Sequence, residues 1–243
     1  MHPIIFSYGP LHLYSYGLFV ATGVLCAIFF IRQNAQLILL NPDTSVDLAI
    51  TTVISGFMGA RIFYVIQFWD YFKNSPLDVF KIWQGGIVLY GGLIGGLLGF
   101  AFFVRISHLS FLSTLDLFVP AMALAQGFGR LGCFFNGCCF GAKCNLPWAV
   151  QFPFLEGKVH PTQLYEAVFC FLLFAFLYGL LKRKKFTGIV ALVYFTIYPF
   201  GRFLIEFLRG DQKYYLFHLT IAQWTSVMFL ILIIVVIARQ RSK

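Results

Sequence analysis

Residues 13–31 read LYSYGLFVATGVLCAIFFI, a predominantly apolar segment without a charged side chain. A helix that crosses the hydrocarbon core of a bilayer needs roughly 20 such residues, so this segment is long enough to span it. Spans of a transmembrane β-barrel would instead appear as ~10-residue segments of alternating polarity. The segment therefore predicts a membrane-spanning helix.

Six further segments of the same kind follow, and the composition agrees with them. The chain has 243 residues, of which 60% are hydrophobic and only 11% are charged. A water-soluble domain cannot hide that share of apolar surface, because polar residues must cover its outside. We expect an all-α integral membrane protein with about seven transmembrane helices. They are predicted at about 13–31, 46–69, 86–104, 115–132, 164–181, 187–206 and 219–238.

The loops between these segments are short, so we expect a single polytopic membrane domain over residues 1–243. The longest region that is not apolar runs from about 133 to 162. The N-terminal region lacks the basic segment and the small-residue cleavage site of a signal peptide. We therefore expect the first span to remain in the mature protein.

Lysine and arginine in short loops predict the orientation. The densest basic runs, at 182–185 and 239–243, fall on one side under a seven-helix count, together with Arg32 and Arg105. We therefore expect a cytoplasmic C-terminus, an exoplasmic N-terminus and an exoplasmic loop at about 133–162. The net charge of +9 then reflects topology and anionic lipid. Because the basic residues are scattered around the spans, nucleic acid is not expected as a partner.

Three polar clusters converge on the predicted exoplasmic side. GRLGCFFNGCCFG at 129–141 ends the fourth span, and VHPTQLYEAV at 159–168 opens the fifth with Glu166 in its first turns. YPFGRFLIEFLRGDQ at 198–212 ends the sixth span. Charges inside a bilayer are costly unless they are paired or hydrated, so they usually indicate function. Glu166 also fits a structural interpretation, as a helix cap or as the partner of a neighbouring cation.

The arginines differ in how strongly they indicate function. Arg130 is flanked by glycines and has no acidic residue within one helical turn to neutralise it, which favours a functional role. Arg202, Glu206 and Arg209 share one helix face because they are four and three residues apart, and they fit either a structural ion pair or a site. Arg61 fits either a side chain that reaches the interface or a functional group.

Glycines recur every four residues in GGIVLYGGLIGGLLGF at 85–100, which is the small-xxx-small pattern that lets helix backbones touch. Helix packing is predicted for three of them: Gly95, Gly96 and Gly99. Four others lie at the outer end of the span, where their backbone N–H groups are candidate ligands of an anion. They are Gly85, Gly86, Gly91 and Gly92.

Four cysteines, Cys133, Cys138, Cys139 and Cys144, have the spacing C-x4-CC-x4-C. This is neither the C-x-x-C of a thiol exchanger nor the spacing of a zinc site, so no metal site is predicted. On the exoplasmic side disulfides persist. Both a disulfide among these residues and small packing thiols fit the pattern.

These motifs together resemble those of the bacterial prolipoprotein diacylglyceryl transferases. GRLGCFFNGCCFG resembles their pattern Gly-Arg-x-Gly-Asn-Phe-x-Asn-Gly, and HPTQLYEA at 160–167 resembles His-Pro-x-Gln-Leu-Tyr-Glu. Further segments are similar to family segments in the same order. They are YSYGLFVATG (14–23), GARIFYV (59–65), WQGGIVLYGGLIGG (83–96), YPFGRFLIEFLRGD (198–211) and LTIAQWTS (219–226).

The resemblance implies a transferase of the bacterial cell (inner) membrane, surrounded by membrane lipid, that needs no metal or redox cofactor. It implies transfer of the diacylglyceryl group of phosphatidylglycerol to the lipobox cysteine of a prolipoprotein signal peptide, with glycerol phosphate leaving. The catalytic candidates are then Arg130, Arg202, Tyr90 and Glu166, with Arg130 on the lipid phosphate and Arg202 helping at the same centre. The candidates for binding phosphatidylglycerol are Arg130, Asn136, Gly91, Gly92, Tyr16, Arg61, Tyr198 and Glu206, and Asp116 and Tyr165 are further matched positions.

The chain departs from the family pattern at two positions: Tyr90 stands in place of a histidine proposed as the base, and Cys133 in place of an asparagine. Tyrosine, with a pKa of about 10, is a poor base at neutral pH. A thiol nucleophile needs little help, since a few per cent is already thiolate, and Glu166 or His160 remains available for the proton.

The alternatives are a divergent paralogue with another thiol or lipid substrate, a membrane transporter and a quinone-linked thiol oxidoreductase. A transporter would carry charges along a path through the bilayer, often with an inverted repeat, and an oxidoreductase would carry C-x-x-C. The sequence shows none of these features.

Overall fold

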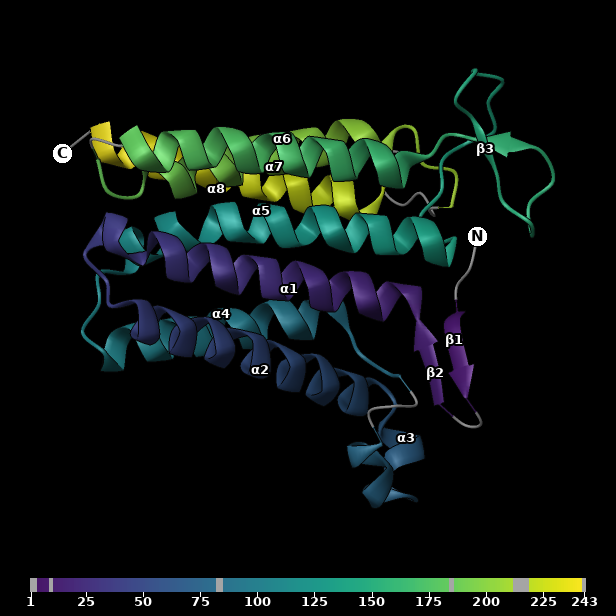
Figure 1. Ribbon diagram of the computed structural model, residues 1–243, viewed down its shortest axis with the longest axis horizontal. Helices are drawn as coiled ribbons and strands as arrows, with labels where there is room; N and C mark the ends of the chain where they lie inside the picture. The colour runs from purple at the N-terminus through teal and green to yellow at the C-terminus, as the bar shows by residue number, and fades with distance from the viewer. Residues whose placement is uncertain (1–3, 9–10, 82–84, 184–185, 212–218, 242–243) are drawn as a thin grey trace. The chain divides into compact units, whose positions relative to one another are not determined.

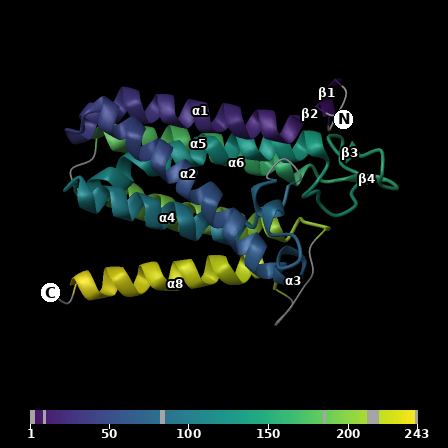
Figure 2. The same cartoon turned by 90° about the horizontal axis from the view of Figure 1, so that it is seen from below.

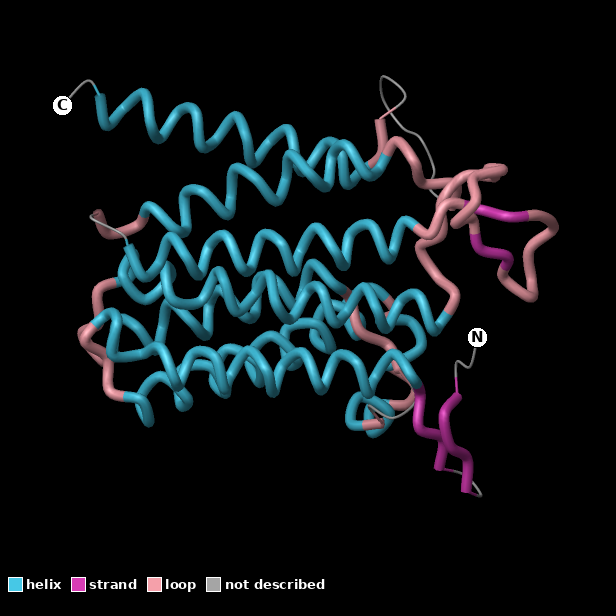
Figure 3. The backbone as a smooth tube through the Cα atoms, turned by 45° about the horizontal axis from the view of Figure 1, so that its top comes forward, coloured by secondary structure: helices cyan, strands magenta, loops and turns pink. Residues whose placement is uncertain are grey.

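The computed structural model describes residues 4–8, 11–81, 85–183, 186–211 and 219–241, and helices dominate it (Figures 1 and 3). The long helices are α1 (Ser15–Asn34), α2 (Pro42–Gln67), α4 (Leu89–Ile106), α5 (Phe111–Asn136), α6 (Thr162–Arg183), α7 (Ile189–Glu206) and α8 (Ile221–Arg241). The short elements are η1 (Ala35–Ile38), α3 (Trp69–Phe72), η2 (Pro76–Phe80), β1 (Ile4–Tyr8), β2 (Leu11–Tyr14), β3 (Val150–Gln151) and β4 (Lys158–Val159).

Six of the described helices are long and apolar enough to cross a membrane: α1, α2, α4, α5, α6 and α7. The prediction of an all-α, multi-pass membrane protein is thereby confirmed. In α8, the apolar stretch with described side chains is shorter, at Ile221–Ile231. The seventh span and the orientation of the termini stay predictions. Part of the charge count behind that orientation lies outside the described residues, at Lys184, Lys185, Lys213 and Lys243.

The first predicted span begins too early, because the chain enters α1 from a hairpin. Strands β1 and β2 pair antiparallel, with Ile4 opposite Tyr14, and the helix starts only at Ser15. Alternation of polarity over so few residues does not separate a strand from the start of an apolar helix.

Contacts divide the chain into two compact units. The first unit comprises residues 1–30 and 115–243, and within it α7 packs against both α6 and α8. The second unit comprises residues 31–114, and its main contact is between α2 and α4. The prediction of one polytopic domain over residues 1–243 stays a prediction.

Glycines allow α2 and α4 to approach each other closely within the second unit (Figure 2). A Cβ atom placed on Gly91 would lie 2.5 Å from the carbonyl oxygen of Gly59, and one on Gly95 would lie 2.5 Å from that of Ser55. Any larger side chain would push the helix backbones apart. The packing role predicted for Gly95 is thereby confirmed, and Gly91 shares it.

In the first unit, Asp116 of α5 holds the start of α7. Its carboxylate accepts hydrogen bonds from the backbone N–H of Gly188, at 2.7 Å, and of Ala191, at 2.9 Å. Asp116 is fully buried. These two N–H groups belong to the first turn of a helix, where no intrahelical acceptor exists, so Asp116 caps α7 from a neighbouring helix.

We expect Asp116→Ala to destabilise the protein without acting on chemistry directly. Loss of a cap costs about 1 kcal/mol, and each buried donor left unsatisfied adds about 1–3 kcal/mol. A clearly lower unfolding temperature, with the transfer rate per folded molecule retained below that temperature, is the expected result. A fully stable but inactive variant would contradict the capping role.

The loop between α5 and α6, residues 137–161, is folded and attached to the end of α7. Phe152 is completely buried at its centre, and the short strands β3 and β4 pair antiparallel within it (Figure 3). The N–H of Gly141 donates to the carbonyl of His160 at 2.9 Å, and that of Ala142 donates to Leu208 at 2.8 Å. The loop therefore joins the starts and ends of three helices at the place where the charged side chains lie.

Candidate active site

Glu166 lies between two arginines that come from different helices. Its carboxylate forms one ion pair with Nη2 of Arg130 at 2.9 Å and another with Nη1 of Arg202 at 3.2 Å. Only 3% of the Glu166 side chain is exposed. Arg130 belongs to the last turns of α5, Glu166 to the start of α6 and Arg202 to α7, so three helix ends meet at one carboxylate.

The ion pairs continue beyond Arg202. Its Nη2 lies 2.6 Å from Oε2 of Glu206, and Nη1 of Arg209 lies 3.7 Å from the same oxygen. Arg209 in turn contacts Asp211 at 2.8 Å, while Thr220 donates to Glu206 at 3.0 Å. The predicted shared face of Arg202, Glu206 and Arg209 is confirmed. Six side chains thus alternate in charge, and we call them the ion-paired row: Arg130, Glu166, Arg202, Glu206, Arg209 and Asp211.

Arg130 is the most exposed arginine of the ion-paired row. Its side chain is 22% exposed, against 11% for Arg202 and 5% for Arg209. No acidic residue lies within one helical turn of Arg130 in the sequence, but Glu166 reaches it from another helix. Removing one member of such a buried pair leaves an uncompensated charge, which costs about 3–5 kcal/mol.

Two predicted tyrosines lie close to these charges. The hydroxyl of Tyr198 donates to Oε1 of Glu166 at 3.5 Å, which is a long hydrogen bond. Tyr16, at the start of α1, lies within electrostatic range of Arg130 and beside Gly132. Asn136 is exposed at the end of α5, and its side chain contacts the thiol of Cys138. The structure therefore brings Tyr16 and Tyr198 to the arginines and directs Asn136 toward the cysteines.

Tyr165, next to Glu166 in the sequence, links two aromatic side chains of the neighbouring loop. Its oxygen lies 2.7 Å from Nε1 of Trp148 and 3.3 Å from Nδ1 of His160. An indole N–H can only donate, so the Tyr165 oxygen accepts from Trp148. Its own proton can then point to Nδ1 of His160, with the histidine in the tautomer that is protonated at Nε2.

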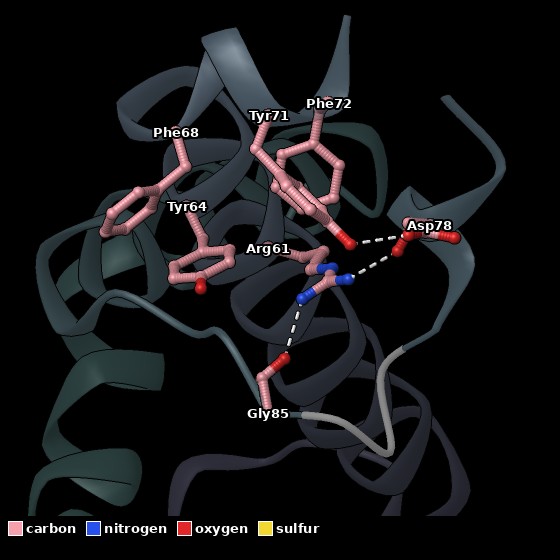
Figure 4. A pocket seen from close by; sticks show the side chains of 7 residues that line it. All are labelled: Arg61, Tyr64, Phe68, Tyr71, Phe72, Asp78 and Gly85. Carbon is pink, nitrogen blue, oxygen red and sulfur yellow. Dashed lines mark hydrogen bonds between the residues drawn. The ribbon is translucent and has the colours of Figure 1, made fainter. Parts of the chain in front are cut away.

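Arg61 makes contacts that the sequence did not predict. In Figure 4 its guanidinium lies among aromatic rings, 5.5 Å from the ring centre of Tyr64 and 5.5 Å from that of Phe72. Within the part of the chain that the structure describes, it donates only to backbone carbonyls, at 2.9, 2.7, 3.0, 2.8 and 3.4 Å. These belong to Val79, Gly85, Gly86, Asp78 and Lys81.

These contacts hold the loop after η2 against α2 and line a cavity of about 320 Å³. Asp78 also lines this cavity. A hydrogen bond from Lys81, and to a smaller extent one from Tyr71, lowers the pKa of the Asp78 carboxyl. Arg61 is buried with its donors in use, so we interpret it as a structural residue rather than a lipid ligand.

We expect Arg61→Lys to lower stability by about 2–3 kcal/mol, because one ammonium group cannot replace a five-donor fork and leaves carbonyls unpaired. Thermal unfolding and protease cleavage near Lys81 measure this loss. The amount of phosphatidylglycerol needed for half-maximal transfer should stay within about twofold of wild type. A much weaker response to lipid with unchanged stability would restore Arg61 as a lipid ligand.

Three other predicted residues belong to the same unit as Arg61. Gly91 is buried in the α2–α4 contact, and the N–H of Gly92 donates to the carbonyl of Val88 at 3.1 Å. We therefore interpret both as helix-packing residues, and not as the anion ligands that the sequence predicts. Tyr90, in the first turn of α4, has about half of its surface exposed.

The spacing of the cysteines in the sequence did not predict that three of their sulfur atoms lie together. The sulfur atoms of Cys133, Cys138 and Cys139 all lie within 4.8 Å of one another. The described residues include all six cysteines, and each is a free thiol. The spacing matches neither a thiol exchanger nor a zinc site, but the turn after α5, at Gly137, folds the thiols of Cys138 and Cys139 back toward that of Cys133.

Fold and site together define a multi-pass helical membrane protein with a mostly buried, ion-paired site at the meeting point of three helix ends. The family model for prolipoprotein diacylglyceryl transferase matches residues 3–239. The chain belongs to this family and is a transferase.

Relatives that match along nearly the whole chain agree with this assignment. The phosphatidylglycerol–prolipoprotein diacylglyceryl transferase of Clostridium tetani is 36% identical over 237 residues, covering 96% of this chain and 95% of its own length. The similarly named protein of a Synechocystis species is 38% identical over 95% of this chain and 86% of its own. That of Staphylococcus aureus is 34% identical over 99% and 90%.

Proposed function

We propose that this chain transfers the diacylglyceryl group of phosphatidylglycerol to the lipobox cysteine of prolipoproteins in the bacterial cell (inner) membrane. The names of the relatives supply both substrates. The observation that carries the proposal is Arg130, a partly exposed guanidinium that Glu166 holds at one end of the ion-paired row.

The reaction is a substitution at a glycerol carbon of the lipid. The cysteine sulfur forms a bond to that carbon, the bond from the carbon to the phosphate oxygen breaks, and glycerol phosphate leaves with the electron pair. The thiol proton goes to a base. Thiolate is a strong nucleophile, so the greater barrier is departure of an anion at low dielectric. A guanidinium stabilises that anion with two parallel hydrogen bonds.

The two arginines divide this task. Arg202 uses Nη1 for Glu166 and Nη2 for Glu206, and it is largely buried. Arg130 contacts Glu166 through Nη2 and is the more exposed of the two. We therefore assign the leaving phosphate to Arg130, and we assign to Arg202 the positioning of Glu166, which in turn orients Arg130. Tyr198 lies beside Glu166, and Tyr16 lies within electrostatic range of Arg130.

The pair of Tyr165 and His160 is the best candidate for accepting the thiol proton. Glu166 would have to give up two ion pairs to accept it. Imidazole is a common general base in proteins, and here Tyr165 fixes the orientation of the His160 ring at 3.3 Å. We propose that the proton passes to His160, directly or through the hydroxyl of Tyr165.

This assignment predicts opposite results for two variants. His160→Gln should lower the transfer rate by about 100-fold or more. Tyr90→Phe should retain partial activity, because a tyrosine hydroxyl is a poor base. The transfer rates of the two variants, measured with a lipobox peptide, decide between His160 and Tyr90 as the group that takes part in the chemistry. Complete loss in Tyr90→Phe, with His160→Gln active, would place Tyr90 in the chemistry instead.

Complementation tests the function as a whole. A bacterium depleted of its own transferase should regain growth with this chain, and its lipoproteins should gain the mass of a diacylglyceryl group. Growth without that mass shift, or no rescue by a chain that inserts normally, would favour a divergent paralogue with another thiol or lipid substrate.

A further inference from the structure

The sulfur atoms of Cys133, Cys138 and Cys139, which we call the thiol cluster, have no part in the transfer reaction proposed above. They lie within 4.8 Å of one another. Cys133 is buried in the last turn of α5, and the other two are half-buried in the loop that follows. Asn136 lies between Cys133 and Cys138 in the sequence and contacts the Cys138 thiol.

The backbone at Cys139 indicates that its thiol is retained for more than packing. Its φ of 64° lies in the left-handed region. A residue with a Cβ atom is costly there, by about 1–2 kcal/mol, whereas glycine or asparagine is accepted more readily. An unfavourable conformation of this kind, next to a charged site, is a reason to look for a function.

The guanidinium groups of Arg209 and Arg130 lie within electrostatic range of Cys139. Several thiolates around one cation carry a net negative charge, which the same arginines would stabilise.

We propose that Cys133, Cys138 and Cys139 form a binding site for one thiophilic cation, of the class of Cu(I) or Zn(II). Thiolates are soft ligands that select these ions. Zinc–sulfur bonds of about 2.3 Å place two bound sulfurs about 3.8–4.0 Å apart, so small side-chain rotations bring the three atoms onto one ion. Binding displaces the thiol protons and leaves one coordination position open.

Two other roles fit the cluster less well. A cluster thiol cannot carry the diacylglyceryl group as an intermediate, because the thioether formed has no leaving group suited to a second substitution. A disulfide is the remaining alternative, and the structure has all three as free thiols.

The cluster is mechanically connected to the active site. The carbonyl of Cys138 accepts from Nε2 of Gln163 at 2.7 Å, and that of Cys139 accepts from Oγ1 of Thr162 at 2.8 Å. Both donors belong to the first turn of α6, which carries Glu166. Metal occupancy is therefore expected to inhibit lipid transfer, a consequence that, unlike the binding itself, rests on the proposed function.

Metal uptake by the full-length protein in lipid nanodiscs tests the site. The protein is reduced with a phosphine, freed of metal, dialysed against Zn(II) or Cu(I), and analysed by elemental mass spectrometry. We expect one bound ion per chain. Cys133→Asn, Cys138→Ser and Cys139→Gly should each weaken binding by more than about 100-fold, since loss of even an outer-sphere partner costs about 10- to 100-fold.

Cys144→Ser is the matched control, because Cys144 is a half-buried thiol of the same loop outside the cluster, and it should bind like wild type. Equal binding by all variants would overturn the site. So would no uptake by protein whose thiols titrate as reduced, or a disulfide within the cluster that forms in the isolated protein. Uptake without a change in transfer would overturn only the coupling to α6.

Discussion

Arg130→Ala is expected to abolish lipid transfer while the protein still inserts and folds. Loss of a single hydrogen-bond donor to a developing anion lowers an enzymatic rate by about 100- to 1,000-fold, and a guanidinium supplies a full charge as well. We therefore expect a loss of about 1,000-fold or more. The measurement is the initial rate of lipid attachment to a lipobox peptide, with phosphatidylglycerol in nanodiscs.

Two variants control this result. Arg130→Lys keeps the charge but not the planar fork, so it should recover only part of the rate. Arg105→Ala removes an exposed arginine at the end of α4 that is not a member of the ion-paired row, and it should be nearly neutral. Normal lipoprotein maturation by Arg130→Ala would refute the assignment.

Glu166→Gln is expected to have the second-largest effect, and its effects on rate and on lipid binding should differ. The amide keeps the shape but loses the charge that holds Arg130 and Arg202, at 2.9 and 3.2 Å. The rate at saturating lipid should fall by about 100-fold or more, because a misplaced catalytic group costs that much. The lipid needed for half-maximal rate should stay equal or decrease, because the competing anion is gone.

This split separates a positioning role from a merely structural one. A destabilised protein would lose active molecules without a change in its response to lipid. Glu166→Ala leaves buried guanidinium groups uncompensated and should also lower the unfolding temperature. A Glu166→Gln variant that is fully active would remove Glu166 from the account.

The helices were predictable because the bilayer requires long apolar segments, and no tertiary information is needed to find them. The hairpin before α1 was not predicted, because its strands are short and are largely apolar like the helix that follows them. The packing of Gly95 followed from its spacing alone. The role of Gly91 did not, since an anion site and a helix contact call for the same small residue.

The site was predictable only where its partners are neighbours on one helix. Arg202 and Glu206 are four residues apart, so their ion pair follows from helix geometry. The pair of Arg130 with Glu166 depends on how two helices pack, and local sequence cannot show it. The same holds for Arg61, whose acceptors are backbone carbonyls, and for the thiol cluster, which depends on one turn at Gly137.

The proposed mechanism requires contact between Arg130 and the lipid phosphate. Magnetic recoupling between guanidinium nitrogen and lipid phosphorus measures this contact. Protein with ¹⁵N-labelled guanidinium groups is placed in phosphatidylglycerol nanodiscs, and the ³¹P-dependent loss of the ¹⁵N signal is recorded. A component of this signal loss should disappear in Arg130→Gln and persist in Arg105→Gln. A signal loss that is unchanged in Arg130→Gln would contradict the proposed contact.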